Sequence, residues 1–340
     1  MFDGCTSLTT APELPAITLE EGCYSHMFYG CSELNHIIML ATNIDASSCL
    51  SNWVSGVAST GTFVKHPNMT TLLEGENGIP SGWTPEDYVI NNDIDYSTEY
   101  FTIVNTSDSP LDVQLTQNTT IQTLNYKLPN SDTWSEGTSI TVNVGGEIQL
   151  KGNYTPVSRY GIGTFNISRG TFDVKGNIMS LLFNDDFEEE VDLSEEIAPF
   201  FSLFKNCTTL VNANELILPA TTLGTKCYES MFEGCEGLTT APALPATILA
   251  FYCYKSMFRN CVKLTTSPEL PAAGLTFNCY QNMFEGCSEL NHITMLASTL
   301  TSGSLDNWVN GIASNGTFIK HPSMRSLPRG NNGVPKNWNI

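Results

Sequence analysis

The stretch MFEGCEGLTTAPALP (residues 231–245) decides the fold, because copies of it recur near both ends of the chain. Further copies begin at positions 1, 27, 203, 257 and 283. The steps between their phenylalanines are 26 residues in the first block and then 28, 26 and 26 in the second, measured at Phe2, Phe28, Phe204, Phe232, Phe258 and Phe284. A fixed period of this size is typical of a solenoid, in which each unit buries its apolar face against its neighbours.

Each repeat unit contains two segments of different character. Apolar residues recur every fourth position in LEEGCYSHMFYGC, at Leu19, Cys23 and Met27, and this spacing predicts a short amphipathic helix that ends near Gly30. The segment LTTAPELPA (residues 8–16) is too rich in Thr and Pro for a helix, and it predicts a very short strand. One unit is therefore expected to pair a short strand with a short helix.

The repeat consensus resembles a known family. Its F-x-x-C-x-x-L core, its L-P turn and its C-Y-x-x-M-F helix resemble the BspA-type leucine-rich repeats of Bacteroidetes surface proteins, over residues 1–83 and 198–340. The resemblance implies a mixed α/β solenoid of short parallel strands and short helices. It also implies an extracellular or cell-surface location and, for some members of the family, attachment to host proteins or to other cells.

Both repeat blocks end in the same way. NHIIMLATNIDASSCLSNWVSGVASTGTFVKHPNM (residues 35–69) returns as NHITMLASTLTSGSLDNWVNGIASNGTFIKHPSM (residues 291–324). We interpret this module as a cap, since the last repeat of a solenoid otherwise exposes an apolar face. The pattern predicts a strand over 36–40, a helix that ends near Ala58 and an edge strand over 61–65. Trp53 and Trp308 are expected to plug the two ends.

The chain divides into five parts. Residues 1–83 form the C-terminal part of a first repeat block with its cap, 84–98 form a polar linker, and 198–340 form a second block whose cap covers 291–340. Between them, 99–155 predicts a small antiparallel, Ig-like β-sandwich, because five period-two segments alternate with turns. These segments are 100–105, 112–115, 123–128, 139–144 and 147–150; Trp134 is either the core aromatic of the sandwich or a rim residue. Residues 156–197 predict β-hairpins that cover the second block, followed by an acidic loop.

Composition excludes several classes of partner. The 340-residue chain has a net charge of -20, with 15 Lys and Arg against 35 Asp and Glu. Phosphates demand clustered basic side chains, so nucleic acid and anionic membrane surfaces are not expected partners. No run of apolar residues is long enough for a transmembrane helix, and residues 1–30 lack the pattern of a signal peptide. Met1 coincides with the first Met of a repeat, so we expect a fragment of a longer parent.

The eleven cysteines follow the repeat rather than a disulfide framework. Their spacing alternates between 18 and 8 residues in both blocks. A ladder of this kind favours buried thiols, which pack as small hydrophobes. If Cys23 and Cys31 share one helix they are about 12 Å apart, which is beyond disulfide reach.

No motif with catalytic or metal-binding chemistry stands out. The acidic run 185–196 holds eight acids in twelve residues but lacks the spacing and interior Gly of a calcium loop, so a solvated loop is favoured. His36 matches His292 and His66 matches His321, which makes these histidines properties of the cap rather than a zinc site. We therefore expect no enzyme, no cofactor and no metal.

Binding is the remaining class of function. The predicted strands would present small hydroxyl and acidic side chains, and these are the candidate binding residues: Thr9, Thr10, Glu13, Thr239, Thr240, Thr265, Thr266 and Glu269. A second ladder, of Tyr24, Tyr228, Tyr254 and Tyr280, favours packing between layers over a stacking platform for sugars. The expected function is a non-enzymatic adhesion or binding module for a protein or glycan on a host or neighbouring cell. The alternative is a structural stalk or a phage or prophage fibre-type component without a dedicated ligand.

Overall fold

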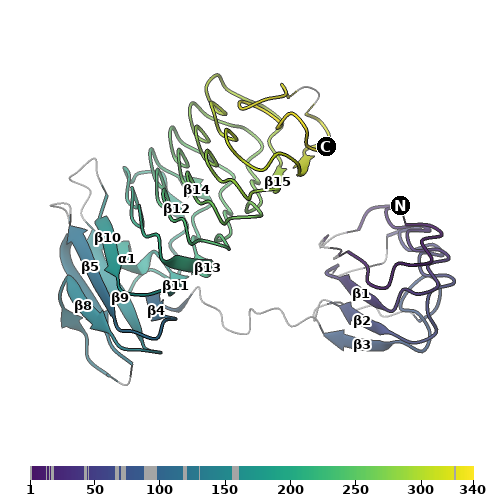
Figure 1. Ribbon diagram of the computed structural model, residues 1–340, viewed down its shortest axis with the longest axis horizontal. Helices are drawn as coiled ribbons and strands as arrows, with labels where there is room; N and C mark the ends of the chain where they lie inside the picture. The colour runs from purple at the N-terminus through teal and green to yellow at the C-terminus, as the bar shows by residue number, and fades with distance from the viewer. Residues whose placement is uncertain are drawn as a thin grey trace. The chain divides into compact units, whose positions relative to one another are not determined.

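The computed structural model describes residues 2–340 except 13, 15, 17–18, 42–43, 45, 66–68, 70–73, 88–97, 118–120, 130, 155–160 and 325–326. The chain forms two compact units, Met1–Ile94 (unit 1) and Asp95–Ile340 (unit 2). Figure 1 shows the coils of a solenoid in each unit, and in unit 2 these coils follow a β-sandwich. Within the described residues, no helix has the length and hydropathy that crossing a membrane requires.

The repeats form a β-solenoid, so the predicted mixed α/β leucine-rich-repeat fold is wrong. The one helix found in the described part of the chain is α1 (Ser180–Phe183), and it lies outside the repeats. The segments predicted as helices are runs of β-turns instead. Unit 2 shows the pattern most completely, because its repeats are described without a gap from residue 198 to residue 324.

The turn segments alternate two kinds of backbone hydrogen bond. The amide of Met231 donates to the Tyr228 carbonyl within its own coil (3.2 Å), whereas the amide of Phe232 donates to Met257 in the next coil (2.9 Å). Every fourth residue adopts a left-handed conformation, with φ of 63° at Lys226, 58° at Ser230 and 76° at Gly234. An α-helix has negative φ throughout and bonds each amide four residues back. One turn per four residues therefore produces the apolar spacing that we interpreted as helical.

The rest of each coil is extended and pairs in parallel with its neighbours. In unit 2, β13 (Leu210–Ile217) begins this strand side and bridges to Thr240 of the next coil, and the coil of Thr266 bridges to β15 (His292–Met295), which pairs with β16 (Thr317–Lys320). The predicted strands of the middle coils are thus reduced to bridges, such as that from Thr266 to His292. A third side carries the two-residue strands β12 (Asp192–Leu193) and β14 (Thr222–Leu223).

Columns of identical side chains fill the core. Five phenylalanines stack with ring centroids 5.4–5.7 Å apart and planes within 2–15° of each other, at Phe165, Phe204, Phe232, Phe258 and Phe284. Beside them, the Cys235 thiol donates to the Phe204 carbonyl (3.1 Å), and Cys261 and Cys287 repeat this bond one coil apart. No disulfide joins the cysteines, and all of them except Cys5 and Cys23 are buried. Packing of the tyrosine ladder is confirmed for Tyr228, Tyr254 and Tyr280, which are buried and stacked between Phe200 and Trp308.

The sandwich of unit 2 is made of two sheets. One sheet has the order β13-β11-β4-β9-β6-β7 and the other β10-β5-β8. The strands are β4 (Phe101–Asn105), β5 (Leu111–Gln117), β6 (Ile121–Lys127), β7 (Ser135–Glu136), β8 (Ser139–Val142), β9 (Glu147–Tyr154), β10 (Gly163–Ser168) and β11 (Phe172–Asn177). The five strands predicted between 100 and 150 are confirmed as β4, β5, β6, β8 and β9.

The prediction of β-hairpins within residues 156–197 is wrong for β10 and β11, which do not pair with each other. β10 pairs with β5, whereas β11 pairs with β4 on one side and, in parallel, with β13 on the other. The pairing of β11 with β13 joins the sandwich sheet to the strand side of the solenoid. Phe165 on β10 also begins the phenylalanine column, so one core runs from the sandwich into the repeats.

The two caps are built alike. In unit 1, β1 (His36–Met39), β2 (Thr62–Lys65) and β3 (Thr84–Asp87) pair in parallel, so β2 is not an edge strand and the linker predicted at 84–98 begins as a strand. Turns replace the predicted helix before Ala58. Trp53 and Trp308 are both completely buried, and their indole N–H groups donate to Gly78 (2.8 Å) and Gly333 (2.9 Å). Both tryptophans are thus buried inside the caps, and their role as plugs stays a prediction.

Candidate functional site

The predicted binding residues lie on the strand side of the coils. Thr10, Thr240 and Thr266 occupy the same position of the repeat, bridged to His36, Asn212 and His292 of the neighbouring coils. All the predicted threonines are exposed, and so is Glu269. Glu13 lies outside the described residues. The structure thus places Thr239, Thr240, Thr265, Thr266 and Glu269 together in unit 2, and Thr9 and Thr10 separately in unit 1.

Two of the four predicted threonines of unit 2 are fixed by side-chain hydrogen bonds to the preceding coil. The Thr239 hydroxyl donates to the Val211 carbonyl (3.0 Å), and the Thr240 hydroxyl donates to the side-chain oxygen of Asn212. No hydrogen bond involves the side chains of Thr265 and Thr266 within the described structure, so these two hydroxyls face solvent without a protein partner. The row therefore offers both fixed and rotatable hydroxyl groups to a ligand.

A shallow groove of about 530 Å³ lies beside this row. Its lining comes from three successive coils and consists mainly of proline rings and alanine, with one carboxylate and one amide: Asn214, Ala241, Pro242, Ala243, Leu244, Pro245, Pro268, Glu269 and Pro271. The sequence analysis found Glu269 but missed Asn214 and the prolines. The repeated A-P-A-L-P and S-P-E-L-P motifs were the signal, because prolines at the same position in successive coils must lie side by side.

Acidic groups mark the beginning of the strand side. Asp173 on β11 pairs in register with Asn212 on β13. Burial raises the pKa of Asp173, a hydrogen bond from the Asn212 backbone lowers it in part, and the charge of Glu215 raises it again. One carboxylate oxygen of Asp173 has no hydrogen-bond partner in the described structure. The strand side is thus acidic at this end and rich in hydroxyl groups further along.

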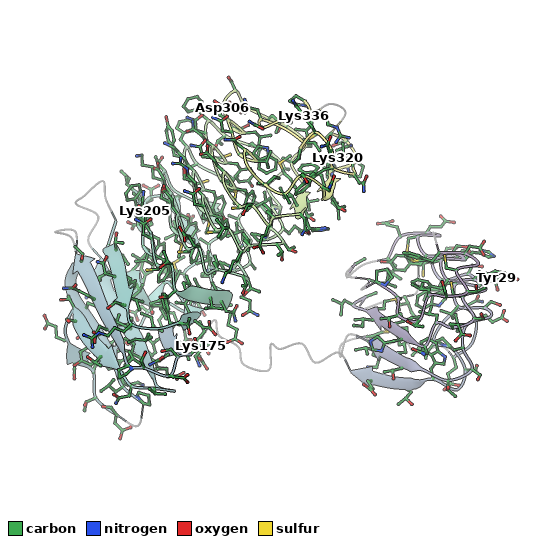
Figure 2. All side chains as sticks on the ribbon, viewed as in Figure 1. Tyr29, Lys175, Lys205, Asp306, Lys320 and Lys336 are labelled. Atoms are coloured by element: carbon green, nitrogen blue, oxygen red, sulfur yellow. The ribbon has the colours of Figure 1, made fainter. Side chains whose placement is uncertain are left out.

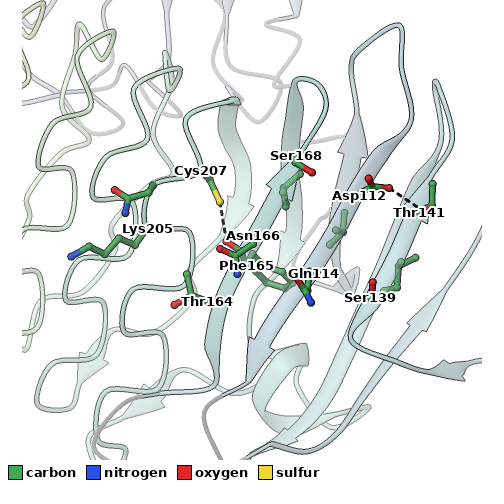
Figure 3. Close-up of a pocket in the computed structure, with 14 residues that line it drawn as sticks. Asp112, Gln114, Ser139, Thr141, Thr164, Phe165, Asn166, Ser168, Lys205 and Cys207 are labelled. Atoms are coloured by element: carbon green, nitrogen blue, oxygen red, sulfur yellow. Dashed lines mark hydrogen bonds between the residues drawn. The ribbon is translucent and has the colours of Figure 1, made fainter.

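A second cavity, of about 540 Å³, lies elsewhere in unit 2. Figure 3 shows it between the outer face of the β10-β5-β8 sheet and the first coil of the solenoid. A junction pocket with converging acids would favour an enzyme, because paired carboxylates supply acid–base chemistry. The lining contains a single carboxylate, that of Asp112.

The acidic run is mostly exposed, as predicted for a solvated loop, and its first residue, Asp185, is also anchored to the sandwich. The Asp185 carboxylate accepts hydrogen bonds from Lys151 Nζ (2.6 Å) and from the Tyr100 hydroxyl (2.7 Å). The Lys151 bond holds the pKa of Asp185 below its usual range. Burial, together with the bond to Asp185, raises the pKa of Tyr100 to about 12. Lys151 Nζ lies 4.5 Å from the ring centroid of half-buried Trp134, which is a rim residue of the sandwich.

Among the described residues, no group of three or more His, Cys, Asp or Glu side chains is arranged so that it could hold a metal ion. His36 and His292 lie in β1 and β15, and His321 Nδ1 bonds to the Ser323 hydroxyl at 2.6 Å. His66 lies outside the described residues.

No protein-family model, curated protein or solved structure matches this chain. The resemblance to BspA-type repeats therefore stays a prediction from the repeat consensus. What the protein does has to be argued from its own surfaces, and the threonine row with its proline groove is a surface that repeats from coil to coil.

Proposed function

We propose that this protein is a non-enzymatic cell-surface or secreted adhesion module. The strand side of unit 2 presents its threonine row and proline groove to a protein or glycan on a host or neighbouring cell. The observation that carries the proposal is the exposure of Thr265 and Thr266 beside a groove that includes Glu269. Hydroxyl groups, a carboxylate and rigid apolar rings on one surface are the groups that a polar ligand with apolar patches would contact.

The rigidity of the coils supports this proposal. Each coil is fixed to the next by backbone hydrogen bonds and by stacked rings, as between Phe232 and Phe258 (5.5 Å). Binding to a preorganised surface loses less conformational entropy than binding to a flexible one, so more of the contact energy appears as affinity. Groups repeated along the axis also allow a repetitive ligand to bind at several points.

The test is a binding screen with the full chain and two matched variants. The chain is applied to immobilised extracellular-matrix proteins and to a glycan array, and each positive is repeated with Thr240→Lys/Thr266→Lys and with Gln281→Lys, which adds a lysine to the turn side of the coil. We expect the double variant to lose at least tenfold in affinity and the control to bind as the unaltered protein does. Equal binding by all three proteins would exclude the strand side.

The second candidate function is a structural stalk or a phage or prophage fibre-type component. It is favoured by the continuous aromatic columns and by the matching buried tryptophan in the caps of both blocks, features that produce length and rigidity without requiring a ligand. A screen that finds no saturable binding to any matrix protein or glycan would favour this function over adhesion.

A further inference from the structure

We propose that the cavity between the β10-β5-β8 sheet and the first solenoid coil binds a neutral saccharide. This junction groove has a volume of about 540 Å³, within the range of small-molecule sites. Its floor is the outward face of three strands, and Lys205, Asn206 and Cys207 of the first coil form its wall (Figure 3). The proposal is independent of the threonine row, which lies on the strand side of the coils.

The charged groups of the junction groove already have partners. Asp112 accepts an ion-pair contact from Arg169 Nε (3.1 Å) and lies 3.4 Å from the Thr141 hydroxyl. Lys205 Nζ bonds to Glu233 of the next coil at 2.8 Å. A charged ligand would have to compete with these contacts, and anion sites in proteins usually offer several basic groups. The groove therefore suits an uncharged ligand.

The uncharged polar groups of the floor are available instead. Within the described structure, no hydrogen bond to protein engages the side chains of Gln114, Ser139, Thr164 and Ser168, one or two from each strand. Together they offer an amide and three hydroxyl groups, each able to donate and to accept. Sugar hydroxyls also both donate and accept, so a ring lying on this floor can satisfy several groups at once.

Three apolar residues that line the groove are almost completely buried. Val113, Ile140 and Phe165 are at most 8% exposed, so the floor offers no apolar pocket for the side chains of a peptide. This excludes the usual apolar anchors of protein–protein recognition.

The edge of β10 is also closed to a peptide strand. The Phe165 amide donates to Leu203 (2.7 Å) and the Phe165 carbonyl accepts from the Cys207 thiol (3.2 Å). Ile162 donates to Pro199 at 3.0 Å. An added peptide strand needs free backbone groups at a sheet edge. The bonds of Phe165 and Ile162 to the first coil occupy these backbone groups at this edge. They also fix the wall of the groove against its floor.

The test uses isotope-labelled full-length protein titrated with maltose, cellobiose, lactose and chitobiose. Sialyllactose serves as the anionic probe and a neutral alanine–serine peptide as the peptide probe. We expect at least one neutral disaccharide to cause saturable amide shifts clustered at residues 112–114, 139–141 and 164–168. Gln114→Ala and Ser139→Ala should each weaken binding by about 3–10-fold, the loss of one neutral hydrogen bond.

Gln281→Ala is the matched control, since it removes the same amide from a partly exposed position on the turn side of the coil. It should leave the affinity unchanged. Thr240→Lys/Thr266→Lys should also bind the saccharide normally, which separates this site from the proposed adhesion surface. The proposal is overturned by the absence of saturable shifts with every neutral disaccharide, by stronger binding of sialyllactose or of the peptide, or by shifts that gather on the threonine row. Full retention of binding in both Gln114→Ala and Ser139→Ala would overturn it as well.

Discussion

The coil that carries Cys23 in unit 1 exposes this thiol, whereas the matching coil of unit 2 buries Cys227. Both coils follow the same backbone path, with left-handed residues at Gly22, His26 and Gly30 in unit 1 and at Lys226, Ser230 and Gly234 in unit 2. Yet Cys23 is exposed, whereas Cys227, at the same repeat position, is completely buried. Their neighbours differ in the same way, since Tyr24 is half-buried and Tyr228 is buried.

The difference lies in what covers the coil. Around Cys227, the preceding segment lies close, because the Ala198 amide donates to Thr225 (2.9 Å) and a Cβ at Gly224 would collide with the Glu196 carbonyl. Among the described residues of unit 1, none plays this part at Cys23. The repeat positions therefore determine the path of the backbone, and the neighbouring segment determines which side chains are buried.

The outward-facing side chains of the turn segments also differ between the two units. The residue before the last left-handed position of each turn segment is Lys205, Glu233, Arg259 and Glu285 in successive coils of unit 2, and Asp3, Tyr29 and Ser55 in unit 1. Figure 2 labels Lys205 and Tyr29, one from each unit. In unit 2 these side chains form a ladder of alternating charge, from Lys205 to Glu233 (2.8 Å), to Arg259 (3.7 Å) and on to Glu285 (2.9 Å).

Thiol labelling should show the largest difference between the units. We expect Cys5 and Cys23 to react with a maleimide in the native protein at least about a thousandfold faster than Cys227, Cys253 and Cys261, because buried groups react only after opening that costs several kcal/mol. Mass spectrometry of peptides after timed labelling measures the rates. Rapid labelling of Cys253 would contradict the assigned packing.

Truncation of the cap tryptophans should be the most costly substitution. Trp308→Ala and Trp53→Ala each remove a buried indole and an N–H bond, and each should destabilise its own unit by about 3–5 kcal/mol. Peptide-level hydrogen exchange measures the loss of protection in each unit separately. Exchange that stays unchanged in either variant would mean that the cap does not close that block.

Leu8 and Leu238 occupy the same position of the repeat, so the cost of truncating each one compares the two units. Leu238→Ala should cost about 2–5 kcal/mol, because Leu238 is completely buried. Leu8→Ala should cost clearly less, since Leu8 is half-buried at the same repeat position. Chemical denaturation followed by circular dichroism measures both. Equal costs would show that position in the repeat, rather than the covering segment, sets the contribution.

Alkaline pH should weaken unit 2. Burial raises the pKa of Cys207 and Cys287 to about 12 and that of Cys279 to about 11, above the ordinary value of 9.0. A raised pKa means that the folded state holds the proton more tightly, so this stability is complete below pH 9 and is lost as the pH rises toward 11 and 12. Urea midpoints measured under reducing conditions should be flat from pH 7 to 9 and fall above it. A flat profile up to pH 11 would argue against buried thiols.

The charge ladder should have the smallest effect. Glu233→Gln removes a carboxylate that contacts Lys205 and Arg259, and the cost should be about 1 kcal/mol or less because these contacts are partly solvated. The cost should shrink further in high salt. Asp3→Asn is the control, since exposed Asp3 has no ion-pair partner among the described residues of unit 1. An equal change in both variants would indicate a general effect of net charge.

Several features followed directly from the residues. The 26-residue step predicted the stacked coils, the recurring Phe, Cys and Leu predicted the core, and the duplicated ends predicted the caps with Trp53 and Trp308. The sandwich strands were predictable because their alternation is local. The grooves were not, since each is lined by segments that meet only after folding, such as Gln114 with Lys205 and Asn214 with Glu269.

The sequence by itself determined that one repeat coil stacks on the next and which side chains point inward, because a period and its apolar positions are properties of the chain. It did not determine the backbone, since a four-residue spacing is compatible both with an α-helix and with a run of β-turns. The choice between them depends on hydrogen bonds to the neighbouring coil, such as that from Gly234 to Arg259 (2.7 Å), and these exist only in the folded stack. The same dependence decides the exposure of MFEGC and its copies, with Cys235 buried and Cys5 exposed at one repeat position.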